Sequence, residues 1–462
     1  MMFRKETEFQ ETEIGKLPEG WRIKRLGEVA IIRSGFSERR RDERSRVIHL
    51  RPDNINNETD KIIFNDIVYI PESSKIEKYL LEHLDIVLVN TNGSINHIGK
   101  VGIIDFSLDK KITFSNHLTA IRIASKDINP YYVYYFLSLL HLKGYYKKLV
   151  KNQAGKWNLN LSTIRDLLIP IPPLEEQKRI ADILSMIDSG IEAVDRAIAK
   201  LEGMKRALLN ELLTGRIRVR EENGRLTFYK ETEFQETEIG EMPKDWYVKR
   251  LKEVADFQRG FSYRSDEKFA EEIPDGYLFL TLNSVKEGGG LKENGWTWIK
   301  SNKIKDRHFV REGDLVIANT EQSKDGSLIG SPAIVHFPKW YKKDKAVFSH
   351  HISRLLLKIN NIDVNFLFYY LSFVQPLARK YHTGTGVWGL DVDKWGTDLL
   401  IPLSPIKEQT AIAEILSTVD KAIEPYRKEE EKLLRLRRGL MSVLLTGRVR
   451  VVSDVRDVGV VV

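Results

Sequence analysis

The sequence predicts an α+β protein in which two globular domains of mixed helix and strand are joined by two long helices. The stretch KETEFQETEIG occupies residues 5–15 and recurs unchanged at residues 230–240, so the chain contains an internal repeat. Residues 172–215 and 404–447 each keep apolar residues at alternating intervals of four and three, which is typical of a long helix with one buried face. In each half, the sequence between these features measures about 155 residues, an ordinary size for one domain.

The composition describes a folded protein that works without cysteine chemistry. Hydrophobic residues make up 42% of the 462 residues, and there is no cysteine. Disulfides, thiolate zinc sites and cysteine nucleophiles are therefore excluded. The start lacks the apolar core of a signal peptide, and no run of about 18 apolar residues is present to span a membrane, so we expect a cytoplasmic protein. The net charge of +8 fits a nucleic-acid partner, although many soluble proteins without such a partner share it.

Each half of the chain repeats the same frame around a divergent insert. The matching segments, in pairs, are residues 16–30 and 241–255, 166–188 and 398–420, and 212–219 and 444–451. Within the inserts, short β-branched runs at 85–90 and 314–319 predict strands. Aromatic-rich runs at 131–142 and 364–374 predict buried helices.

The two long helices carry a seam of apolar residues with a period of about 3.5 residues, which is typical of a coiled coil. The seam residues are Ile180, Leu184, Ile187, Ile191, Val194, Ile198, Leu201, Ile412, Leu416, Val419, Ile423, Leu433 and Leu440. Pro173 and Pro405 suit the first helical turn, and Gly215 and Gly447 suit the cap that follows the last turn. About 40 helical residues make a rod of roughly 60 Å.

Three residues disturb this seam. Lys205 and Arg437 interrupt it at the same place in both copies, and a polar seam residue can fix the register of paired helices. The alternative, which we favour from the sequence, is that the seam drifts at this point onto Met204 and Leu436. Pro425 falls inside the second helix, where it removes a backbone hydrogen bond and predicts a kink.

Three motifs occur in both halves and carry a resemblance to a known family. They are LPEGW…KRL at 17–26 with MPKDW…KRL at 242–251, IPIPPLEEQKRIADIL at 169–184 with IPLSPIKEQTAIAEIL at 401–416, and LLTGRIRV with LLTGRVRV at the helix ends. With its order of insert, long helix, insert and long helix, the chain resembles the specificity subunit of type I DNA restriction–modification systems. The pattern covers essentially the whole chain, twice.

The resemblance implies that the inserts are target recognition domains, each of which reads one half of a bipartite site in double-stranded DNA. It implies that the long helices form an antiparallel coiled coil, which spaces the domains and docks two methylation subunits, and that restriction and translocation subunits join this core. The duplicated stretch would form the same joint on both sides of a pseudo-twofold axis. The subunit would bind no cofactor itself, because S-adenosylmethionine, ATP and Mg²⁺ belong to its partners. The runner-up interpretation is a stand-alone, two-headed, sequence-specific DNA-binding regulator.

The motifs also set the expected domain boundaries. The segments are an N-terminal conserved segment at 1–15, a first recognition domain at 16–171, a first spacer helix at 172–215, a central conserved segment at 216–240, a second recognition domain at 241–403, a second spacer helix at 404–447 and a C-terminal tail at 448–462.

No motif in the chain predicts catalysis. An adenine methyltransferase needs an Asn/Asp-Pro-Pro-aromatic motif, and the only Pro-Pro pair (172–173) starts a helix; no Gly-rich phosphate loop ending in Lys-Ser/Thr is present. The nuclease-like Glu-x-Lys triplets at 176–178 and 430–432 lie in the long helices, where carboxylates at a helix start or on a solvated face are the commoner explanation. Adjacent His350 and His351 would point to opposite faces of a strand, which disfavours a shared metal ion. We therefore expect a non-catalytic chain without a metal site.

Candidate DNA contacts lie in Arg-rich and Asn- or Gln-containing loops of the inserts. Arginine commonly contacts guanine edges and phosphates, and Asn or Gln can pair with adenine edges. The candidates are Arg39, Arg40, Arg41, Arg44, Asn92, Ser94, Lys151, Asn152, Gln153, Lys156, Asn158, Arg259, Arg264, Gln322, Lys324, His382, Thr383 and Thr385. A solvated charged loop is the alternative for the arginines of residues 38–46. Trp21 and Trp246 are expected to anchor cores, and His117, which aligns with His351, is expected to be structural.

Overall fold

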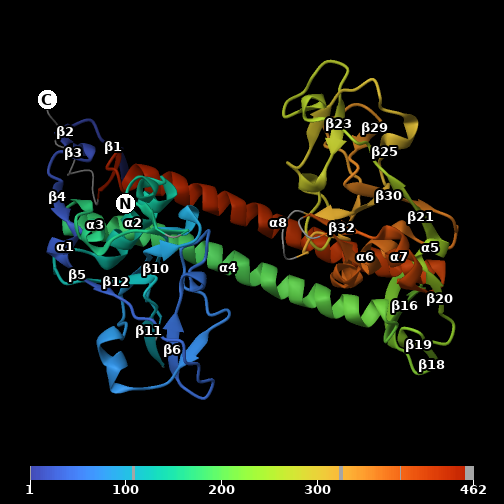
Figure 1. Ribbon diagram of the computed structural model, residues 1–462, viewed down its shortest axis with the longest axis horizontal. Coiled ribbons are helices and arrows are strands. Elements are labelled where there is room, and N and C mark those ends of the chain that lie inside the picture. The colour runs from blue at the N-terminus through green and yellow to red at the C-terminus, as the bar shows by residue number, and fades with distance from the viewer. Residues whose placement is uncertain (1, 107–109, 154, 322–325, 385–386, 453–462) are drawn as a thin grey trace. The chain divides into compact units, whose positions relative to one another are not determined.

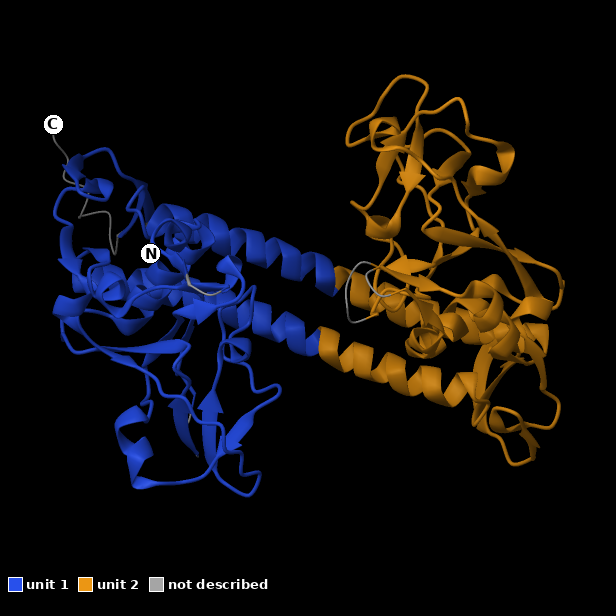
Figure 2. Ribbon diagram, in the orientation of Figure 1, with its two compact units in different colours: residues 1–197, 426–462 blue, residues 198–425 orange. Residues whose placement is uncertain are grey.

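The computed structural model divides into two compact units (Figure 2). Unit 1 comprises residues 1–197 and 426–462, and unit 2 comprises residues 198–425. The residues that the structure describes are 2–106, 110–153, 155–321, 326–384 and 387–452. Each unit contains one divergent insert together with a part of each long helix.

Unit 1 combines several small sheets with short helices. Its strands are β1 (Met2–Lys5), β2 (Phe9–Thr12), β3 (Gly15–Pro18), β4 (Arg22–Arg25), β5 (Ala30–Ser34), β6 (Val47–Leu50), β7 (Val68–Ile70), β8 (Ile86–Val89), β9 (Thr91–Asn92), β10 (Val101–Ile103), β11 (Lys111–Phe114), β12 (Leu118–Ile123), β13 (Lys151–Gln153), β14 (Lys156–Asn158), β15 (Leu168–Ile171) and β34 (Val449–Val452). Its short helices are α1 (Leu26–Val29), α2 (Pro130–Leu142) and α3 (Leu161–Arg165). Within the described residues, the central sheet is antiparallel with the order β10-β8-β12-β5, and the remaining sheets are β11-β6-β7, β13-β14-β9, β15-β4, β2-β3 and β1-β34.

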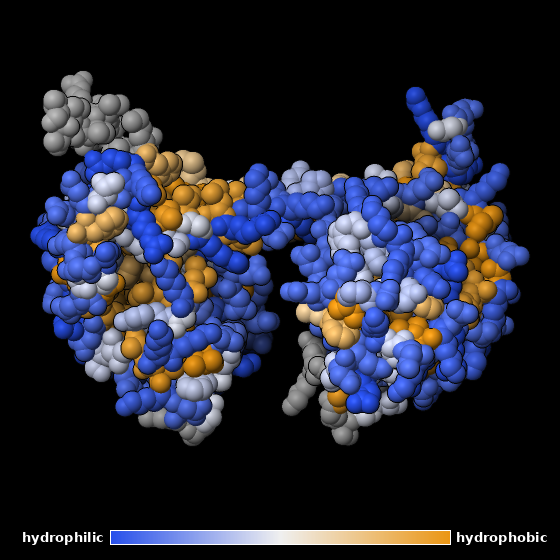
Figure 3. Space-filling view, turned by 90° about the horizontal axis from the view of Figure 1, so that it is seen from above, coloured by the Kyte–Doolittle hydropathy of each residue, from blue (hydrophilic) through white to orange (hydrophobic). Residues whose placement is uncertain are grey.

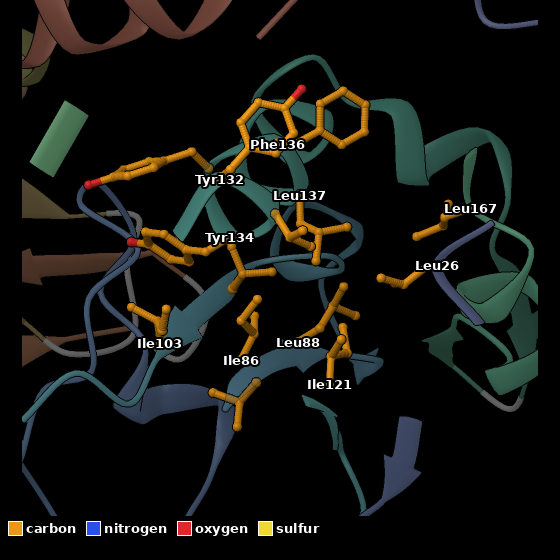
Figure 4. Close-up of a cluster of buried hydrophobic side chains, with 14 of the residues drawn as sticks. Leu26, Ile86, Leu88, Ile103, Ile121, Tyr132, Tyr134, Phe136, Leu137 and Leu167 are labelled. Atoms are coloured by element: carbon orange, nitrogen blue, oxygen red, sulfur yellow. The ribbon is translucent and has the colours of Figure 1, made fainter. Parts of the chain in front are cut away.

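Helix α2 covers one face of the central sheet and supplies aromatic side chains to the core of unit 1 (Figure 4). Tyr132 and Tyr134 are buried in the same core cluster as Ile86 and Leu88 of β8. Burying side chains of this size contributes about 1.5–3 kcal/mol each. The helix begins after Asn129, whose side chain accepts a hydrogen bond from the backbone N–H of Tyr132 (3.1 Å). These contacts confirm the predicted buried helix at 131–142, and β8 confirms the strand predicted at 85–90.

Unit 2 repeats this plan. Its strands are β16 (Ile217–Glu222), β17 (Arg225–Lys230), β18 (Phe234–Thr237), β19 (Gly240–Pro243), β20 (Tyr247–Arg250), β21 (Ala255–Arg259), β22 (Lys268–Phe269), β23 (Tyr277–Leu280), β24 (Thr297–Ile299), β25 (Phe309–Arg311), β26 (Leu315–Ala318), β27 (Thr320–Glu321), β28 (Pro332–Ile334), β29 (Lys345–Phe348), β30 (Ile352–Leu357), β31 (His382–Thr383), β32 (Trp388–Leu390) and β33 (Leu400–Leu403). Its short helices are α5 (Leu251–Val254), α6 (Val364–Val374) and α7 (Val392–Asp398), which confirms the helix predicted at 364–374. Its central sheet has the order β21-β30-β26-β28, the counterpart of β5-β12-β8-β10 in unit 1.

The second sheet of each insert differs in size. Among the described residues, unit 2 joins β22-β24-β23-β29-β25, whereas the corresponding sheet of unit 1 joins only β11-β6-β7. Each of these sheets contains one parallel pair, in which an earlier strand of the insert pairs with a later one. The pairs are β6 with β11 and β23 with β29. The inserts therefore share one topology and differ in how far it is elaborated.

The two long helices are α4 (Leu174–Leu213) and α8 (Ile406–Leu444), which are labelled in Figure 1. Each contributes to both units (Figure 2). In unit 1, Arg437 of α8 donates to Asp188 of α4 (Nε to Oδ1, 2.7 Å), and Glu430 lies beside Asp195. From the first pair to the second, the residue number rises along α4 and falls along α8. These two segments therefore run in opposite directions. Every predicted seam residue is buried or half-buried.

The favoured explanation for the seam break is wrong. Met204 and Leu436, onto which the seam was expected to drift, are 46% and 47% exposed, whereas the side chain of Arg437 is 1% exposed. Arg437 remains in the seam because Asp188 neutralises its charge there. Helix α8 continues through Pro425, and because this part of the helix is exposed, water can bond the carbonyl that the proline leaves unpaired.

A buried glutamine fixes the start of each long helix. Gln177 donates to the carbonyl of Pro172 (2.8 Å) and accepts from the backbone N–H of Asn129 (2.9 Å), just before α2. Gln409 donates to the carbonyl of Ser404 (2.7 Å) and accepts from the N–H of Asp363 (2.9 Å), just before α6. The repeated Glu-Gln pair in this motif is therefore structural, since the glutamine ties the long helix to the insert.

A glycine terminates each long helix next to a tryptophan. Gly215 and Gly447 both have φ +70°, a left-handed conformation that favours glycine. A Cβ on Gly447 would lie 2.3 Å from Cγ of Pro18, so this position has no room for another side chain. Trp21 and Trp246 are both buried here, which confirms that they anchor the core.

An ion-paired arginine links the two ends of the chain in unit 1. Strand β1 pairs with β34, and Arg450 on β34 donates to Glu176 (2.6 Å) and to Glu6 (2.8 Å). The indole Nε1 of Trp21 donates to the same Glu176 (3.3 Å). We call this group, Arg450, Glu6, Glu176 and Trp21, the first joint.

Unit 2 contains the same group assembled from the middle of the chain. Arg218 on β16 donates to Glu408 (2.7 Å) and Glu231 (2.6 Å), and Trp246 donates to Glu408 (3.2 Å). Here Asp245 adds a third carboxylate (2.8 Å). This second joint places the glutamate of the duplicated stretch where Glu6 stands in the first joint, which confirms that the duplicated stretch forms the same joint twice.

The surface view shows hydrophilic side chains over most of the visible face, with scattered apolar patches (Figure 3). No helix among the described residues combines the length and the apolar character that crossing a membrane requires.

Candidate nucleic-acid interface

A polar cavity of about 290 Å³ opens in unit 1 where loops of the insert meet. It is lined by Arg51, Pro52, Asp53, Thr91, Asn92, Gly93, Ser115, His117 and Lys156. Strands β9 and β14 form one wall because they pair in antiparallel register. The 3₁₀ turn Pro52–Asn54, which follows β6, contributes Pro52 and Asp53 to the lining. Two basic side chains, one acid and several neutral hydrogen-bonding groups therefore face one small space, which we call the first cavity.

Local hydrogen bonds fix the polar groups of the first cavity. The side-chain oxygen of Asn92 accepts from the backbone N–H of Ser94 (2.9 Å), which orients its amide. The imidazole of His117 is held by the turn between β11 and β12, and its Nδ1 has no hydrogen-bond partner among the described residues. Burial lowers the pKa of His117, and the nearby Lys156 lowers it further, so the ring is neutral at pH 7. A neutral imidazole can donate or accept a hydrogen bond.

Unit 2 holds a second cavity of about 310 Å³ on the corresponding loops. It is lined by Tyr263, Lys268, Thr281, Leu282, Asn283, Glu287, Glu321, Leu328 and His351. The 3₁₀ turn at 282–284, strand β27 and the turn after β29 take the places of their counterparts in unit 1. Its lining differs in charge, because two glutamates accompany one lysine.

Glu321 and His351, on two sides of the lining of the second cavity, are held by different hydrogen bonds. Glu321 accepts hydrogen bonds from the backbone N–H groups of Leu328 and Ile329 (both 3.0 Å), so this carboxylate holds the loop that it faces. His351 shares a hydrogen bond with the hydroxyl of Thr320 (2.8 Å). Burial lowers the pKa of His351 to about 4, with smaller effects from His350 and Arg259, so the ring is neutral at pH 7.

One expectation about histidines needs correction. His350 and His351 do not point to opposite faces, because they occupy a turn rather than a strand and their ring centroids lie 3.9 Å apart. Even so, the described residues contain no group of three or more His, Cys, Asp and Glu able to hold a metal ion. His117 and His351, which were expected to be structural, line the two cavities.

The structure brings some of the predicted DNA contacts of the first insert together. Asn92 and Lys156 line the first cavity, and Ser94 and Asn158 belong to the segments that border it. Lys151, Asn152 and Gln153 form β13, the outer strand of the same small sheet.

The arginine-rich loop lies apart from this group. Arg39, Arg40, Arg41 and Arg44 do not line the first cavity, and the loop that carries them is largely exposed. Arg40 bonds Glu38 (2.9 Å), and this bond is the main reason that the pKa of Glu38 falls to about 2. The loop remains compatible with phosphate contacts or with simple solvation.

The predicted contacts of the second insert are more scattered. Arg259 donates to the carbonyl of His350 (3.1 Å), beside the second cavity, whereas Arg264 pairs with Asp266 at the surface. The ring of His382 stacks on Trp388 (4.2 Å between centroids). Thr383 donates to the carbonyl of Gly389 (3.1 Å) in the same small sheet. Gln322, Lys324 and Thr385 lie outside the described residues.

Sequence reasoning missed several cavity residues. Arg51 and Asp53 in unit 1, and Asn283, Lys268 and Glu287 in unit 2, were not among the candidates. A signal was available, because RPDN at 51–54 and TLNS at 281–284 occupy corresponding places in the two inserts. In both segments a 3₁₀ turn forms, and its last residue hydrogen-bonds back to the first. The two turns therefore share one backbone conformation but carry different side chains.

The repeated frame and its paired cavities define a protein built from two copies of one module. The family model described as the type I restriction modification DNA specificity domain matches residues 18–203 and 243–435. Together these segments cover most of the chain, and the chain therefore belongs to this family and carries the domain twice.

Relatives and a solved structure agree with this assignment. The chain is 28% identical over 475 residues to the type I restriction enzyme MjaVIII specificity subunit of Methanocaldococcus jannaschii, covering 98% of each chain. It is 24% identical over 317 residues to the EcoKI specificity subunit of Escherichia coli, covering 65% of this chain and 62% of that one. The crystal structure of a type I restriction–modification S subunit from M. genitalium shares the fold, with a TM-score of 0.52, 14% identity, and coverage of 92% of this chain and 96% of that chain.

Proposed function

We propose that this chain reads a bipartite DNA site for a type I restriction–modification complex and performs no catalysis itself. The observation that carries the proposal is the pair of cavities, which the same frame holds on corresponding loops with unlike linings. A repeated frame suits one task performed twice, and unlike linings suit two different half-sites.

Each cavity fits a different base edge. In the first cavity, Arg51 and Lys156 are donors of the kind that contact guanine O6 and N7, and Asn92 can pair with adenine. In the second cavity, Glu287 is an acceptor of the kind that bonds the cytosine amino group, and Asn283 can pair with adenine. The proposed half-sites therefore differ in the donors and acceptors that they present.

The recognition domains are assigned to residues 16–171 and 241–403, with the long helices between them as a spacer. The opposite direction of the α4 and α8 segments in unit 1 supports an antiparallel coiled coil. S-adenosylmethionine, ATP and Mg²⁺ are assigned to the partner subunits, and restriction and translocation subunits complete the complex.

The two joints are proposed to dock two identical methylation subunits. Phe3 beside the first joint and Phe228 beside the second stand at matching positions and are 58% and 54% exposed. Exposed aromatic side chains commonly anchor protein interfaces. A duplicated stretch that stays identical while the inserts diverge suits two copies of one partner.

The direct test is to map methylated bases in cells that express this chain with its methylation subunit. We expect one bipartite motif. Replacing residues 16–171 with the corresponding segment of another family member is expected to change one half of that motif and preserve the other. A change in both halves, or methylation by the isolated chain, contradicts the proposal.

A matched pair of variants tests the docking surfaces. Phe3→Asp and Phe228→Asp are each expected to remove one methylation subunit, and the double variant both, in sedimentation of the purified complex. Phe64→Asp, at an exposed phenylalanine away from the joints, is the control and is expected to leave the complex intact. Equal assembly of all variants would place the docking surface elsewhere.

A further inference from the structure

A cation from one long helix and an acid from the other meet a tyrosine of the insert in unit 1. The guanidinium of Arg437 donates to Asp188 (2.7 Å), and the hydroxyl of Tyr135 on α2 donates to the other oxygen of the same carboxylate (2.9 Å). Asp188 thereby joins both long helices to the helix that forms the core of the insert. We call Arg437, Asp188 and Tyr135 the first clamp.

A loop of the insert also reaches the first clamp. Arg437 donates to the carbonyl of Thr59 (3.2 Å) and pairs with the carboxylate of Asp60 (3.8 Å). The hydroxyl of Ser138 donates to the same carboxylate, and Tyr134 donates to the Asp60 carbonyl (3.1 Å). Arg437 therefore bonds to α4 and to the loop between β6 and β7 with one rigid, planar group.

Unit 2 contains a simpler second clamp. Lys205 of α4 donates to Asp420 of α8 (2.6 Å), and Tyr369, at the place in α6 that Tyr135 has in α2, donates to the same carboxylate (2.9 Å). Here Gly289 stands near the position that corresponds to Asp60. A Cβ on Gly289 would lie 2.5 Å from Oγ of Ser372, and that hydroxyl has no hydrogen-bond partner among the described residues.

Stability alone does not explain these groups. Removing charges from water is costly, and a buried ion pair is often no more stable than apolar side chains of similar size. Such a pair adds geometric specificity, because its hydrogen bonds form in only one arrangement of the helices. In both clamps that arrangement also includes an insert tyrosine.

We infer that Arg437 and Lys205 are positioning residues that fix the orientation of each recognition domain on its helix pair. This inference rests on the proposed function. Arg437 follows the second insert in the sequence but holds the first, and Lys205 follows the first insert but holds the second. Each recognition domain is therefore matched to a cation in the helix of the other repeat, and a replacement domain has to supply a compatible tyrosine and loop.

The test uses the complex of the full chain with its methylation subunits. Methylation rates are compared on DNA with the natural spacer and with the spacer lengthened or shortened by one base pair, which turns one half-site by about 35° relative to the other. A rigidly held domain discriminates between these substrates, and a loosened domain tolerates the change. Arg437→Met is expected to reduce the rate ratio by about fivefold. Lys205→Met is expected to have a smaller effect, because the Lys205 and Asp420 side chains are 24% and 40% exposed.

Controls separate positioning from stability. Arg438→Met and Arg206→Met alter exposed neighbours on the same helices and are expected to keep the wild-type ratio. Tyr135→Phe removes only the hydroxyl bond to Asp188, so it tests the first clamp even where Arg437→Met fails to fold, and Arg437→Lys is expected to restore part of the discrimination.

Slower methylation with an unchanged spacer ratio in Arg437→Met or Tyr135→Phe would overturn the inference, because lost stability lowers all rates alike. A wild-type complex that methylates no bipartite site would instead overturn the proposed function.

Discussion

The two joints are nearly the same in both halves of the chain, whereas the two cavities differ, although both arose in the same repeated frame. The joints agree group by group, with an arginine bonded to two glutamates and a tryptophan bonded to one of them. The cavities share their supporting loops but differ in the charge of their linings. The difference teaches that the frame keeps one shared geometry in both copies, whereas the linings of the two cavities are free to diverge.

The largest effect is expected at the joints. Glu176→Gln leaves Arg450 with Glu6 as its remaining carboxylate in the first joint, and breaking a buried pair costs about 3–5 kcal/mol. Glu408→Gln is expected to cost less, because Arg218 keeps Glu231 and Asp245. Urea unfolding of the full chain, followed by tryptophan fluorescence, measures both losses. Equal losses would show that the extra carboxylate of the second joint contributes nothing.

The next effect concerns pH and distinguishes the two clamps. Burial raises the pKa of Asp60 to about 6, and Arg437, Ser138 and Lys100 only partly oppose this. Because the folded pKa exceeds the unfolded value of 3.8, the stabilisation by this group is present below pH 4 and lost as the pH rises through about 6. Relative to Asp60→Asn, the wild-type chain is expected to lose roughly 2 kcal/mol of stability between pH 4 and pH 7.

Urea unfolding at both pH values measures this difference. In unit 2 Gly289 stands near the position that corresponds to Asp60, so no matching change is expected there. A constant difference between the wild-type chain and Asp60→Asn would mean that Asp60 stays ionised in the folded state.

An intermediate effect is expected in DNA binding. Arg51→Ala is expected to weaken binding by about 1–3 kcal/mol and to relax discrimination at one position of one half-site. Glu287→Ala is expected to act on the other half-site alone. Competition binding with DNA altered in one half at a time measures both effects. Uniform weakening across all sequences would reassign Arg51 to the DNA backbone.

The smallest effect compares the two long helices. Gly439 lies inside α8 with nothing within 4 Å of a built Cβ, and Ala207 stands at the corresponding place in α4. Gly439→Ala is expected to stabilise the chain by up to about 1 kcal/mol, because alanine loses less backbone entropy in a helix. Thermal unfolding measures the gain. The matched variant Gly447→Ala is expected to destabilise, since its Cβ would meet Pro18.

Much of the frame could be predicted from the sequence. The duplicated stretch, the helix seam and the proline and glycine at the helix ends are local patterns, because sequence identity, a repeating period and capping each involve neighbouring residues. The candidate sites were predicted less completely. Lys156 and Asn92 were found through their polar loops, but Arg51 was missed because it looks like any surface arginine until the fold carries it to β14.

The sequence by itself determined the repeated order of insert and long helix, since that order is written in motifs that occur twice. Only the tertiary structure decided which polar groups meet. Arg437 looked like an interruption in an apolar seam, and it is buried because its partner, Asp188, lies 249 positions away along the chain. The cost of burying a charge depends on what surrounds it, and those surroundings come from distant segments that only the folded chain brings together.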